Sequence, residues 1–222
     1  MRGCGGLVAF DMDGTLVKLE SSWLLIHRAM GTESDAKINA ERYYCGQISY
    51  DEWAKLDVAL WMGRDFTPAL RAVEAVEPVS GAREALEALR SAGLAVGVIS
   101  SGLDLVLRRL ESLLGFRFDF AVTNELLLDG STLVGWKVNV PFHSKGDVLL
   151  RVTRRLDVPL SEVAVVGDAE NDLSMFRLPV GLRVAFNPTS PELEREADVV
   201  IRSESLLDVA EAILDWCEDD RT

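Results

Sequence analysis

A short apolar segment followed directly by two carboxylates is the feature that most constrains the fold of this chain. Residues 7–10 read Leu-Val-Ala-Phe, and Asp11-Met12-Asp13-Gly14-Thr15 follows without a break. An apolar run of this length is typical of a buried strand, and the Gly-Thr turn after it ends the strand. Open α/β sheets place their polar groups at the carboxyl ends of such strands. The sequence therefore predicts a buried strand that delivers Asp11 and Asp13 to one edge of a sheet.

Two later apolar runs, at residues 94–99 and 163–166, also end in polar residues. Because the carboxyl ends of parallel strands share one edge of a sheet, we expect these polar groups to meet the first pair of acids. A lysine opens the helix that is predicted between the two runs and joins the same edge. The residues in question are Ser100, Ser101, Gly102, Lys145, Asp168, Asn171 and Asp172.

Carboxylates gathered at one edge would repel one another strongly at short range. A hard divalent cation makes such a cluster tolerable, and Mg²⁺ accepts oxygen ligands while keeping several of its waters. The chain has only five lysines, so a lysine beside the acids is a specific feature. Lys145 would hold the cluster in place and bind a phosphoryl oxygen as a point charge. The pattern thus predicts a magnesium site that also accepts a phosphate group.

The rest of the chain divides into a helical segment and an alternating one. From the first motif to about residue 76 the apolar spacing is helical only, and after Pro78 helices and strands alternate. Alternation of this kind predicts an α/β fold with a doubly wound parallel sheet and right-handed crossovers. We expect an α/β core domain made of residues 1–17 and 77–222, with a small helical cap of residues 18–76 inserted after the first strand.

Residues 120–138 are predicted to form one short strand and then a hairpin. The strand covers residues 120–123, and the hairpin pairs residues 126–128 with 132–138 across an Asp129-Gly130 turn.

The helical segment is rich in aromatic residues, because it contains three of the five tryptophans and all three tyrosines. These rings either form the core of a small helical module or line a ligand pocket.

Composition excludes several classes of partner. The chain has 222 residues, is 48% hydrophobic and carries a formal net charge of −13, so its field repels nucleic acid and anionic membrane surfaces. Any anionic substrate must be attracted by local cations or by a metal. The three cysteines lack metal-ligand spacing and suggest a reducing compartment, and the apolar run near the N-terminus is too short for a signal peptide. We expect a cytoplasmic protein.

Taken together, these motifs resemble those of a known family. The motifs Asp11-x-Asp13-Gly14-Thr15, Ser100, Lys145 and Gly167-Asp168-x-x-Asn171-Asp172 resemble, in order and spacing, the four motifs of the haloacid dehalogenase (HAD) superfamily. The resemblance covers almost the whole chain and is closest to the phosphoserine-phosphatase-like branch, including its archaeal-type members. The helical insertion is similar to the small cap of that branch.

The resemblance implies Mg²⁺-dependent hydrolysis of a small phosphorylated metabolite. Asp11 would attack phosphorus and form an aspartyl-phosphate, while Asp13 would act first as acid and then as base. The phosphoryl oxygens would be bound by groups at Ser100, Ser101, Gly102, Lys145 and Asn171. The implied metal-binding residues are Asp11, Asp13, Asp168 and Asp172.

The cap departs from the family pattern at one position. Phosphoserine phosphatases read the amino acid with a cap glutamate, which Glu20 matches, and with a cap arginine, where this chain has Asp57. Asp57 falls on the apolar stripe of its helix and is predicted to face inward, where an anion would repel a substrate carboxylate. Either Arg42 or Arg64 supplies the cation, or the substrate is a different small phosphate ester. A third reading is that Asp57 pairs with an arginine and only fixes the cap.

Phosphoserine is therefore the leading named substrate, and a phosphate ester without a carboxylate is the alternative. A phosphotransferase that passes the phosphoryl group to an alcohol would show the same motifs. A non-catalytic interaction protein is the contrasting class, but such a protein has no reason to keep every acid together with Ser100 and Lys145.

Overall fold

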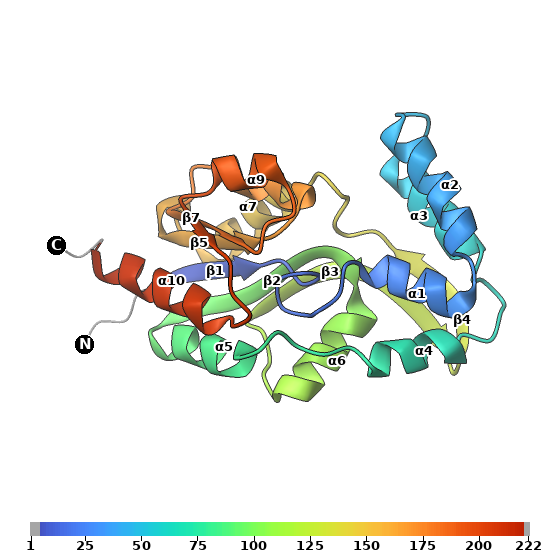
Figure 1. Ribbon diagram of the computed structural model, residues 1–222, viewed down its shortest axis with the longest axis horizontal. Helices are drawn as coiled ribbons and strands as arrows, with labels where there is room; N and C mark the ends of the chain where they lie inside the picture. The colour runs from blue at the N-terminus through green and yellow to red at the C-terminus, as the bar shows by residue number, and fades with distance from the viewer. Residues whose placement is uncertain (1–4, 220–222) are drawn as a thin grey trace.

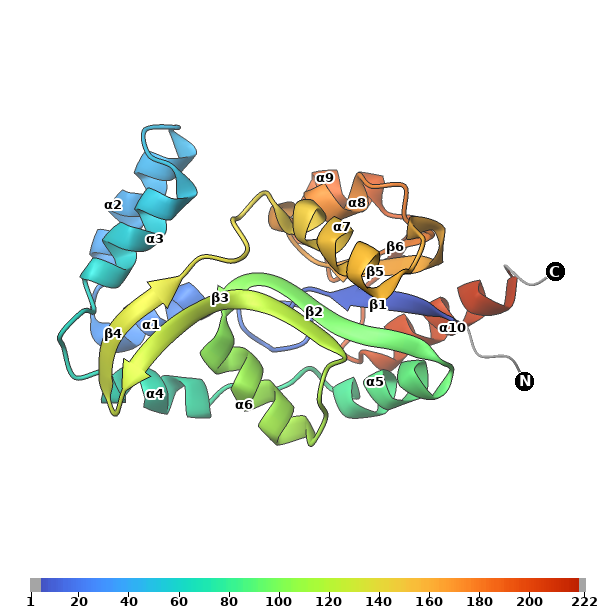
Figure 2. The same cartoon turned by 180° about the vertical axis from the view of Figure 1, so that it is seen from behind.

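The computed structural model describes residues 5–219, which form one seven-stranded sheet with helices on both faces (Figures 1 and 2). The strand order is β4-β3-β2-β1-β5-β6-β7. All neighbouring strands are parallel except β3 and β4, which are antiparallel. The strands are β1 (Gly6–Phe10), β2 (Leu94–Leu103), β3 (Phe120–Asp129), β4 (Thr132–Lys137), β5 (Val163–Gly167), β6 (Leu182–Phe186) and β7 (Val199–Ile201). The predicted α/β class is confirmed.

The helices form two layers around this sheet. Helices α5, α6 and α10 lie on one face, and α7, α8 and α9 lie on the other (Figures 1 and 2). The helices are α1 (Ser22–Met30), α2 (Glu33–Tyr44), α3 (Tyr50–Ala59), α4 (Thr67–Glu74), α5 (Ala82–Ser91), α6 (Asp104–Leu114), α7 (Lys145–Leu156), α8 (Leu173–Phe176), α9 (Pro191–Glu196) and α10 (Leu207–Asp219), with short 3₁₀ turns at Leu160–Glu162 and Glu170–Asp172.

Strand β1 is apolar on both faces because it lies at the centre of the sheet. Val8 and Phe10 belong to the core under α5, α6 and α10, whereas Leu7 and Ala9 belong to the core under α7 to α9. All four residues are fully buried. Burial on both faces explains why the sequence shows a continuous apolar run instead of an alternating one. The polar residues that follow the run are thereby anchored to the most rigid part of the molecule.

Helices α1 to α4, here called the inserted helices, lie between β1 and α5 in the chain. Helix α1 packs against α4, while α2 and α3 form a hairpin that projects away from the sheet (Figure 1). The helical reading of this segment is confirmed, and Ser49 and Glu52 form a capping box at the start of α3. The apolar side chains of Ile26 and Trp61 belong to the same cluster as Phe10 of β1, so the inserted helices share a core with the sheet.

One detail of the predicted topology is wrong, because β3 is a single strand over Phe120–Asp129 and not two separate strands. The polar residue Asn124 breaks the apolar pattern, yet it is buried within the strand. Its amide donates to the carbonyls of Ser101 and Val140 and accepts from the N–H groups of Asn139 and Val140. A fully hydrogen-bonded asparagine can occupy a strand interior, which the sequence pattern does not reveal.

No helix within residues 5–219 is both long enough and apolar enough to span a membrane.

Candidate active site

Asp11 is fixed at the end of β1, the central strand. Its backbone N–H donates to the carbonyl of Val166 in the neighbouring strand β5 at 2.9 Å, which continues the parallel ladder beyond Phe10. The side chain is buried. Because the ladder on both sides of β1 holds the backbone, the Asp11 carboxylate has a defined position at the carboxyl edge of the sheet.

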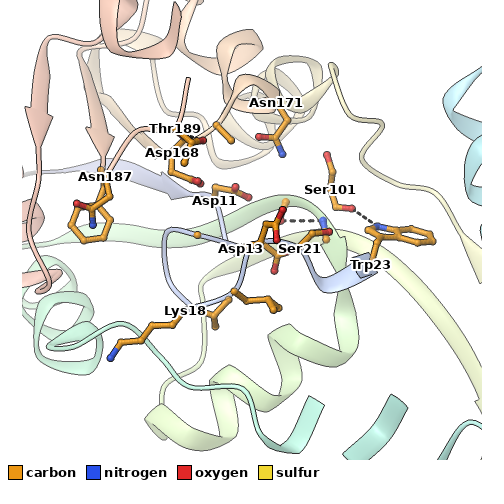
Figure 3. A pocket seen from close by; sticks show the side chains of 18 of the residues that line it. Asp11, Asp13, Lys18, Ser21, Trp23, Ser101, Asp168, Asn171, Asn187 and Thr189 are labelled. Carbon is orange, nitrogen blue, oxygen red and sulfur yellow. Dashed lines mark hydrogen bonds between the residues drawn. The ribbon is translucent and has the colours of Figure 1, made fainter. Parts of the chain in front are cut away.

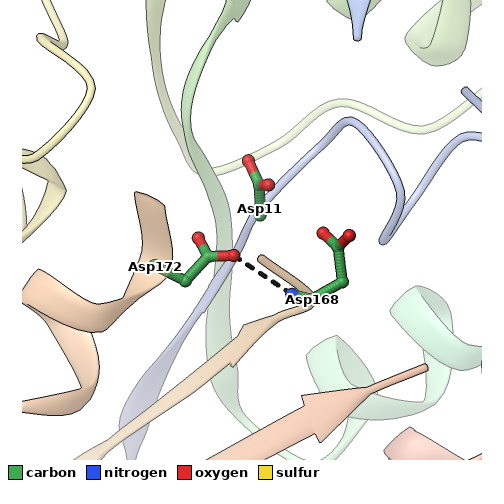
Figure 4. A group of neighbouring side chains, drawn as sticks. All are labelled: Asp11, Asp168 and Asp172. Carbon is green, nitrogen blue, oxygen red and sulfur yellow. Dashed lines mark hydrogen bonds between the residues drawn. The ribbon is translucent and has the colours of Figure 1, made fainter. Parts of the chain in front are cut away.

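Three buried carboxylates meet at this edge. One oxygen each from Asp11, Asp168 and Asp172 lies within 4.8 Å of the others (Figure 4). Asp168 follows β5 directly, and Asp172 ends the short 3₁₀ turn after it. The sequence prediction that the ends of the first and third apolar runs converge is thus confirmed in geometry.

Lys145, the first residue of α7, lies beneath this cluster. Its Nζ is 2.8 Å from Asp11 Oδ1 and 2.6 Å from Asp172 Oδ1. Within the described residues it is the only buried lysine or arginine. Burial alone would lower the pKa of Lys145, but the two ion pairs outweigh burial and raise it. Lys145 is therefore a permanent cation that ties the two acids together.

Asp168 is oriented by its neighbours. Asp172 Oδ2 accepts hydrogen bonds from the backbone N–H groups of Asp168 at 3.0 Å and Ala169 at 3.2 Å. The Thr15 hydroxyl donates to Asp168 Oδ1 at 3.2 Å. Both oxygens of Asp172 are occupied by Lys145 and by these amides, so Asp172 holds the loop in place while the carboxylate of Asp168 faces the cavity.

The charges at this edge do not balance. Burial, with the charges of Asp11 and Asp172, raises the pKa of Asp168 to about 8. Burial, the charge of Asp11 and the opposing effect of Lys145 together bring the pKa of Asp172 to about 6. One lysine thus faces several carboxylates. An all-oxygen donor set with excess negative charge fits a hard divalent cation, so the residues present are suited to such an ion.

Asp13 has a different environment from Asp11, although only one residue separates them. Asp13 Oδ2 accepts the backbone N–H of Ser22 at 2.7 Å, at the N-terminus of α1, and Asp13 Oδ1 is buried without a hydrogen-bond partner. Burial raises the pKa of Asp13 to about 6, with the charge of Asp11 adding to the effect and the Ser22 hydrogen bond opposing it. A carboxyl with this pKa can both give and take a proton near neutral pH.

The end of β2 lies beside Asp13. A Cβ atom on Gly102 would approach Asp13 Oδ2 to 2.8 Å and Ser22 Oγ to 2.7 Å, so only glycine fits at this position. The Ser100 hydroxyl accepts the Gly102 N–H at 3.1 Å, and the Ser101 hydroxyl is buried without a partner. Strand β2 continues through these residues to Leu103, further than the apolar run suggested.

A cavity of about 1280 Å³ lies above these groups, between the sheet edge and the inserted helices. Figure 3 shows Asp11, Asp13 and Asp168 facing its interior, with Asn171 and Ser101 along one side. The Asn171 side-chain oxygen is buried without a partner. The residues of the inserted segment, 18–76, that line the cavity are Lys18, Leu19, Glu20, Ser21, Trp23, Tyr44, Tyr50, Trp53, Ala54 and Asp57.

Asp57 faces inward, as its position on the helix predicts, and is buried. Its partners are not arginines: Asn39 donates to Asp57 Oδ1 at 2.8 Å, and His27 Nε2 lies 3.2 Å from Asp57 Oδ2. Arg64 donates to the carbonyls of Leu60 and Met30, and Arg42 is exposed. Neither arginine lines the cavity. The readings in which Asp57 pairs with an arginine, or Arg42 or Arg64 supplies the missing cation, are therefore wrong for this structure.

Residues 6–178 match the family of haloacid dehalogenase-like hydrolases. The chain belongs to this family. The hydrolase is 28% identical over 209 residues to the phosphoserine phosphatase of Methanocaldococcus jannaschii, a match that covers 93% of this chain and 97% of that protein. The phosphoserine phosphatase of Archaeoglobus fulgidus is 30% identical over 209 residues, and the match covers 93% of this chain but 59% of that longer protein.

Among solved structures, the hydrolase is similar to a phospho-aspartyl intermediate analogue of phosphoserine phosphatase. The TM-score is 0.77 at 28% sequence identity, covering 94% of this chain and 98% of that chain. The fold, the family and the enzyme class predicted from the sequence are confirmed, and the protein is a phosphomonoester hydrolase of the phosphoserine-phosphatase-like type.

The structure of this hydrolase brings the expected site residues together in two layers. Lys145 and Asp172 lie beneath the cavity floor and are fully buried. The others line the cavity, namely Asp11, Asp13, Glu20, Asp57, Ser100, Ser101, Gly102, Asp168 and Asn171. Sequence reasoning missed Thr15 as a partner of Asp168 and Ser22 as a partner of Asp13. The helix start at Ser21-Ser22 was the available signal, because free N–H groups at a helix N-terminus attract a carboxylate.

Replacing Lys145 with methionine tests the ion pairs of the hydrolase. We expect Lys145→Met to lower the free energy of unfolding by about 3–5 kcal/mol in buffer without divalent cations, because Asp11 and Asp172 lose their buried counter-charge. Urea unfolding at pH 7 measures the change. The control is Lys137→Met, an exposed lysine 3.8 Å from Glu125, which should change stability by about 0.5 kcal/mol or less. Equal effects of the two substitutions would contradict this assignment.

Proposed function

We propose that this protein hydrolyses a small phosphate monoester with the help of Mg²⁺, through a covalent phosphoryl group on Asp11. The observation that carries the proposal is the contrast between two carboxylates on one turn. Asp11 is paired with a permanent cation, whereas Asp13 is half-buried, is hydrogen-bonded at only one carboxyl oxygen and has a pKa raised to about 6. Neighbouring acids with different environments are suited to the separate tasks of nucleophile and general acid.

In the first step, a carboxylate oxygen of Asp11 attacks phosphorus in line with the leaving oxygen. The P–O bond to the alcohol breaks as the bond to Asp11 forms, and Asp13 donates its proton to the departing alkoxide. The Asp13 proton is correctly placed for this role because Ser22 holds one carboxyl oxygen and leaves the other free.

In the second step, a water molecule attacks the phosphorus of the aspartyl-phosphate. Asp13, now ionised, takes a proton from that water, and the bond between phosphorus and Asp11 breaks to release inorganic phosphate. Each group returns to its starting state, so one carboxyl serves as acid and then as base. The similar solved structure described as a phospho-aspartyl intermediate analogue supports this two-step route.

The phosphoryl oxygens need donors and positive charge. We assign this role to Lys145, to the Ser100 hydroxyl and to backbone N–H groups near Asp13 and Ser101, with Asn171 at the side. Ser100 and Asn171 line the cavity, and the Lys145 ammonium lies beside Asp11 at its floor. Placed donors of this kind stabilise charge on the transferring group without reorganisation during the reaction.

We assign Mg²⁺ to the carboxylates of Asp11 and Asp168 and to the backbone carbonyl of Asp13. Asp172 acts as an anchor that orients Asp168 and Lys145. The supporting observation is the buried cluster of three carboxylates around one lysine. When bound, the ion would offset the negative charge of the carboxylates and of the phosphate, so that the anionic nucleophile can approach an anionic ester.

Phosphoserine is the first substrate candidate, because the curated relatives described above are phosphoserine phosphatases. We take residues 18–76 as a cap that selects the ester, since Glu20 and Asp57 line the cavity from that segment. Asp57 supports a second candidate, an ester without a carboxylate, because a second anion near Asp57 would be repelled. The phosphate site is common to both candidates, so we assign the choice between them to the cap.

The nucleophile is tested by Asp11→Asn. We expect the wild-type protein with Mg²⁺ to release p-nitrophenol from p-nitrophenyl phosphate, and the variant to lose at least about three orders of magnitude in kcat, because the amide is a poor nucleophile. Circular dichroism should remain that of the wild type. Full activity in the variant would refute Asp11 as nucleophile, and an inactive, metal-loaded wild type would refute the proposed function.

The acid role of Asp13 is tested with leaving groups of different basicity. We expect Asp13→Asn to slow alkyl ester hydrolysis by about 10²–10⁴-fold. With p-nitrophenyl phosphate, whose leaving group departs without protonation, the variant should release about one p-nitrophenol per enzyme in a burst and then turn over slowly. Stopped-flow absorbance measures the burst. Equal loss on both esters without a burst would contradict the role.

The metal assignment is tested by thermal unfolding with and without MgCl₂. We expect saturating Mg²⁺ to raise the Tm of the metal-free protein by roughly 5–10 °C, because the ion binds only the folded carboxylate cluster. Asp168→Asn should remove most of this rise. Asp147→Asn, an exposed acid on α7, should keep it. An unchanged rise in Asp168→Asn would place the ion elsewhere.

A further inference from the structure

Asp57 is held by side chains from two other inserted helices. Asn39 donates to Asp57 Oδ1 at 2.8 Å, and His27 Nε2 lies 3.2 Å from Asp57 Oδ2. His27 Nδ1 in turn lies 2.8 Å from Thr32 Oγ1, which also accepts the Trp61 indole N–H at 3.1 Å. Among the described residues, no lysine or arginine contacts the Asp57 carboxylate, so its negative charge lacks the pairing that Asp11 and Asp172 have with Lys145.

This charge has no cationic partner at the cavity wall. Among the described residues that line the cavity, the only basic ones are Lys18 and Arg202, and neither belongs to the inserted helices. Arg202 pairs with Glu194 at 2.9 Å. The Lys18 side chain extends away from Asp11 and Asp13 in Figure 3. Around Asp57, the contacting side chains are those of His27 and Asn39, and neither is a lysine or an arginine.

Aromatic rings complete this wall of the cavity. Trp23, Tyr50, Trp53 and Phe142 line it together with Asp57. The rings are held in place: Trp53 stacks on Tyr43 with centroids 4.7 Å apart, and Trp23 donates its indole N–H to the Ser101 carbonyl at 2.9 Å. Aromatic faces carry negative potential and attract organic cations, especially beside a carboxylate.

The effect of Asp57 reaches the rings. The pKa of the Tyr50 hydroxyl is raised, first by burial and in smaller part by neighbouring negative charges that include Asp57. Tyr50 also accepts a hydrogen bond from Asn124 at 3.1 Å, which ties this wall to β3. A group that enters this side of the cavity therefore meets a negatively polarised surface whose rings are anchored by contacts with their neighbours.

We propose that this wall binds an alkylammonium group, and that the preferred substrates are phosphate monoesters of amino alcohols that lack a carboxylate. The inference rests on the proposed function and names the substrate class of the same site. A cationic head gains attraction from Asp57 and from the rings of Trp53 and Tyr50. A carboxylate on the same carbon chain would be brought toward Asp57, where like charges repel. Phosphoserine is accordingly a poorer substrate than its carboxylate-free analogues.

Steady-state kinetics on four esters tests the preference, with phosphate release measured in the presence of Mg²⁺. We expect kcat/KM for phosphocholine and phosphoethanolamine to exceed that for phosphoserine and for neutral glycerol 2-phosphate by about tenfold or more. A higher kcat/KM for phosphoserine, or equal values for all four, would overturn the proposal. Activity on p-nitrophenyl phosphate establishes separately that the protein is a phosphatase.

Single substitutions test which residues cause the preference for cationic esters. Asp57→Asn keeps the shape of the side chain and should lower the ratio of kcat/KM for phosphocholine to that for glycerol 2-phosphate by about tenfold. Asp35→Asn removes the same charge from the exposed side of helix α2, outside the cavity lining, and should leave the ratio unchanged. Trp53→Leu should lower the ratio without any change in charge. An unchanged ratio in both Asp57→Asn and Trp53→Leu would overturn the proposal.

Binding to an inactive protein separates this proposal from the proposed function. Calorimetric titration of the Asp11→Asn variant with phosphocholine and with phosphoserine reports ester preference without turnover. Tighter binding of phosphocholine is expected even if no ester is hydrolysed by the wild type, and that combination would refute only the proposed function. Tighter binding of phosphoserine would refute the alkylammonium site while leaving phosphatase activity intact.

Discussion

The ion pairs of Lys145 with Asp11 and Asp172 are the interaction on which the site depends. Lys145 Nζ lies 2.8 Å and 2.6 Å from the two carboxylates, in a region where all three residues are buried. Because a charge is costly to bury alone, each residue requires the other two. The pairs join the start of α7 to the end of β1 and to the 3₁₀ turn after β5. Asp172 also accepts the backbone N–H groups of Asp168 and Ala169, which fixes the position of Asp168. The proposed nucleophile, phosphate-binding cation and metal ligand are thus joined by one set of buried contacts.

The turn that follows β1 explains why Asp11 and Asp13 have different environments. After β1 the chain leaves the sheet, so Asp11 stays with Lys145 while Asp13 reaches the N-terminus of α1. A single sequence motif therefore places one carboxylate against a cation and the other in a half-buried position with only one hydrogen-bonded oxygen. The inserted helices contribute the Ser22 N–H as well as one wall of the cavity. Asp13, the proposed proton donor, is thereby linked to the segment that we propose selects the ester.

Parallel topology explains how much of this site could be predicted from the sequence. Apolar runs that end in acids or hydroxyls must meet at one edge, so the grouping of Asp11, Ser100 and Asp168 follows from the strand pattern alone. The inward orientation of Asp57 followed from helical spacing. Its partners did not, because His27 and Asn39 come from two other helices whose packing depends on tertiary contacts. Tertiary packing also decides which aromatic rings of the inserted helices line the cavity, so the sequence left both their packing role and their lining role open.

In the proposed reaction the phosphoryl group is carried by Asp11 before water removes it. The most direct measurement is to quench the enzyme in acid during steady-state turnover of an ester with Mg²⁺, and to map the modified peptide by mass spectrometry. We expect the added mass of one phosphoryl group on the peptide that contains Asp11. The phosphorylated fraction of this peptide should be higher in Asp13→Asn than in the wild type. Phosphorylation of a different residue, or active enzyme that shows no phosphorylated peptide in either protein, would contradict it.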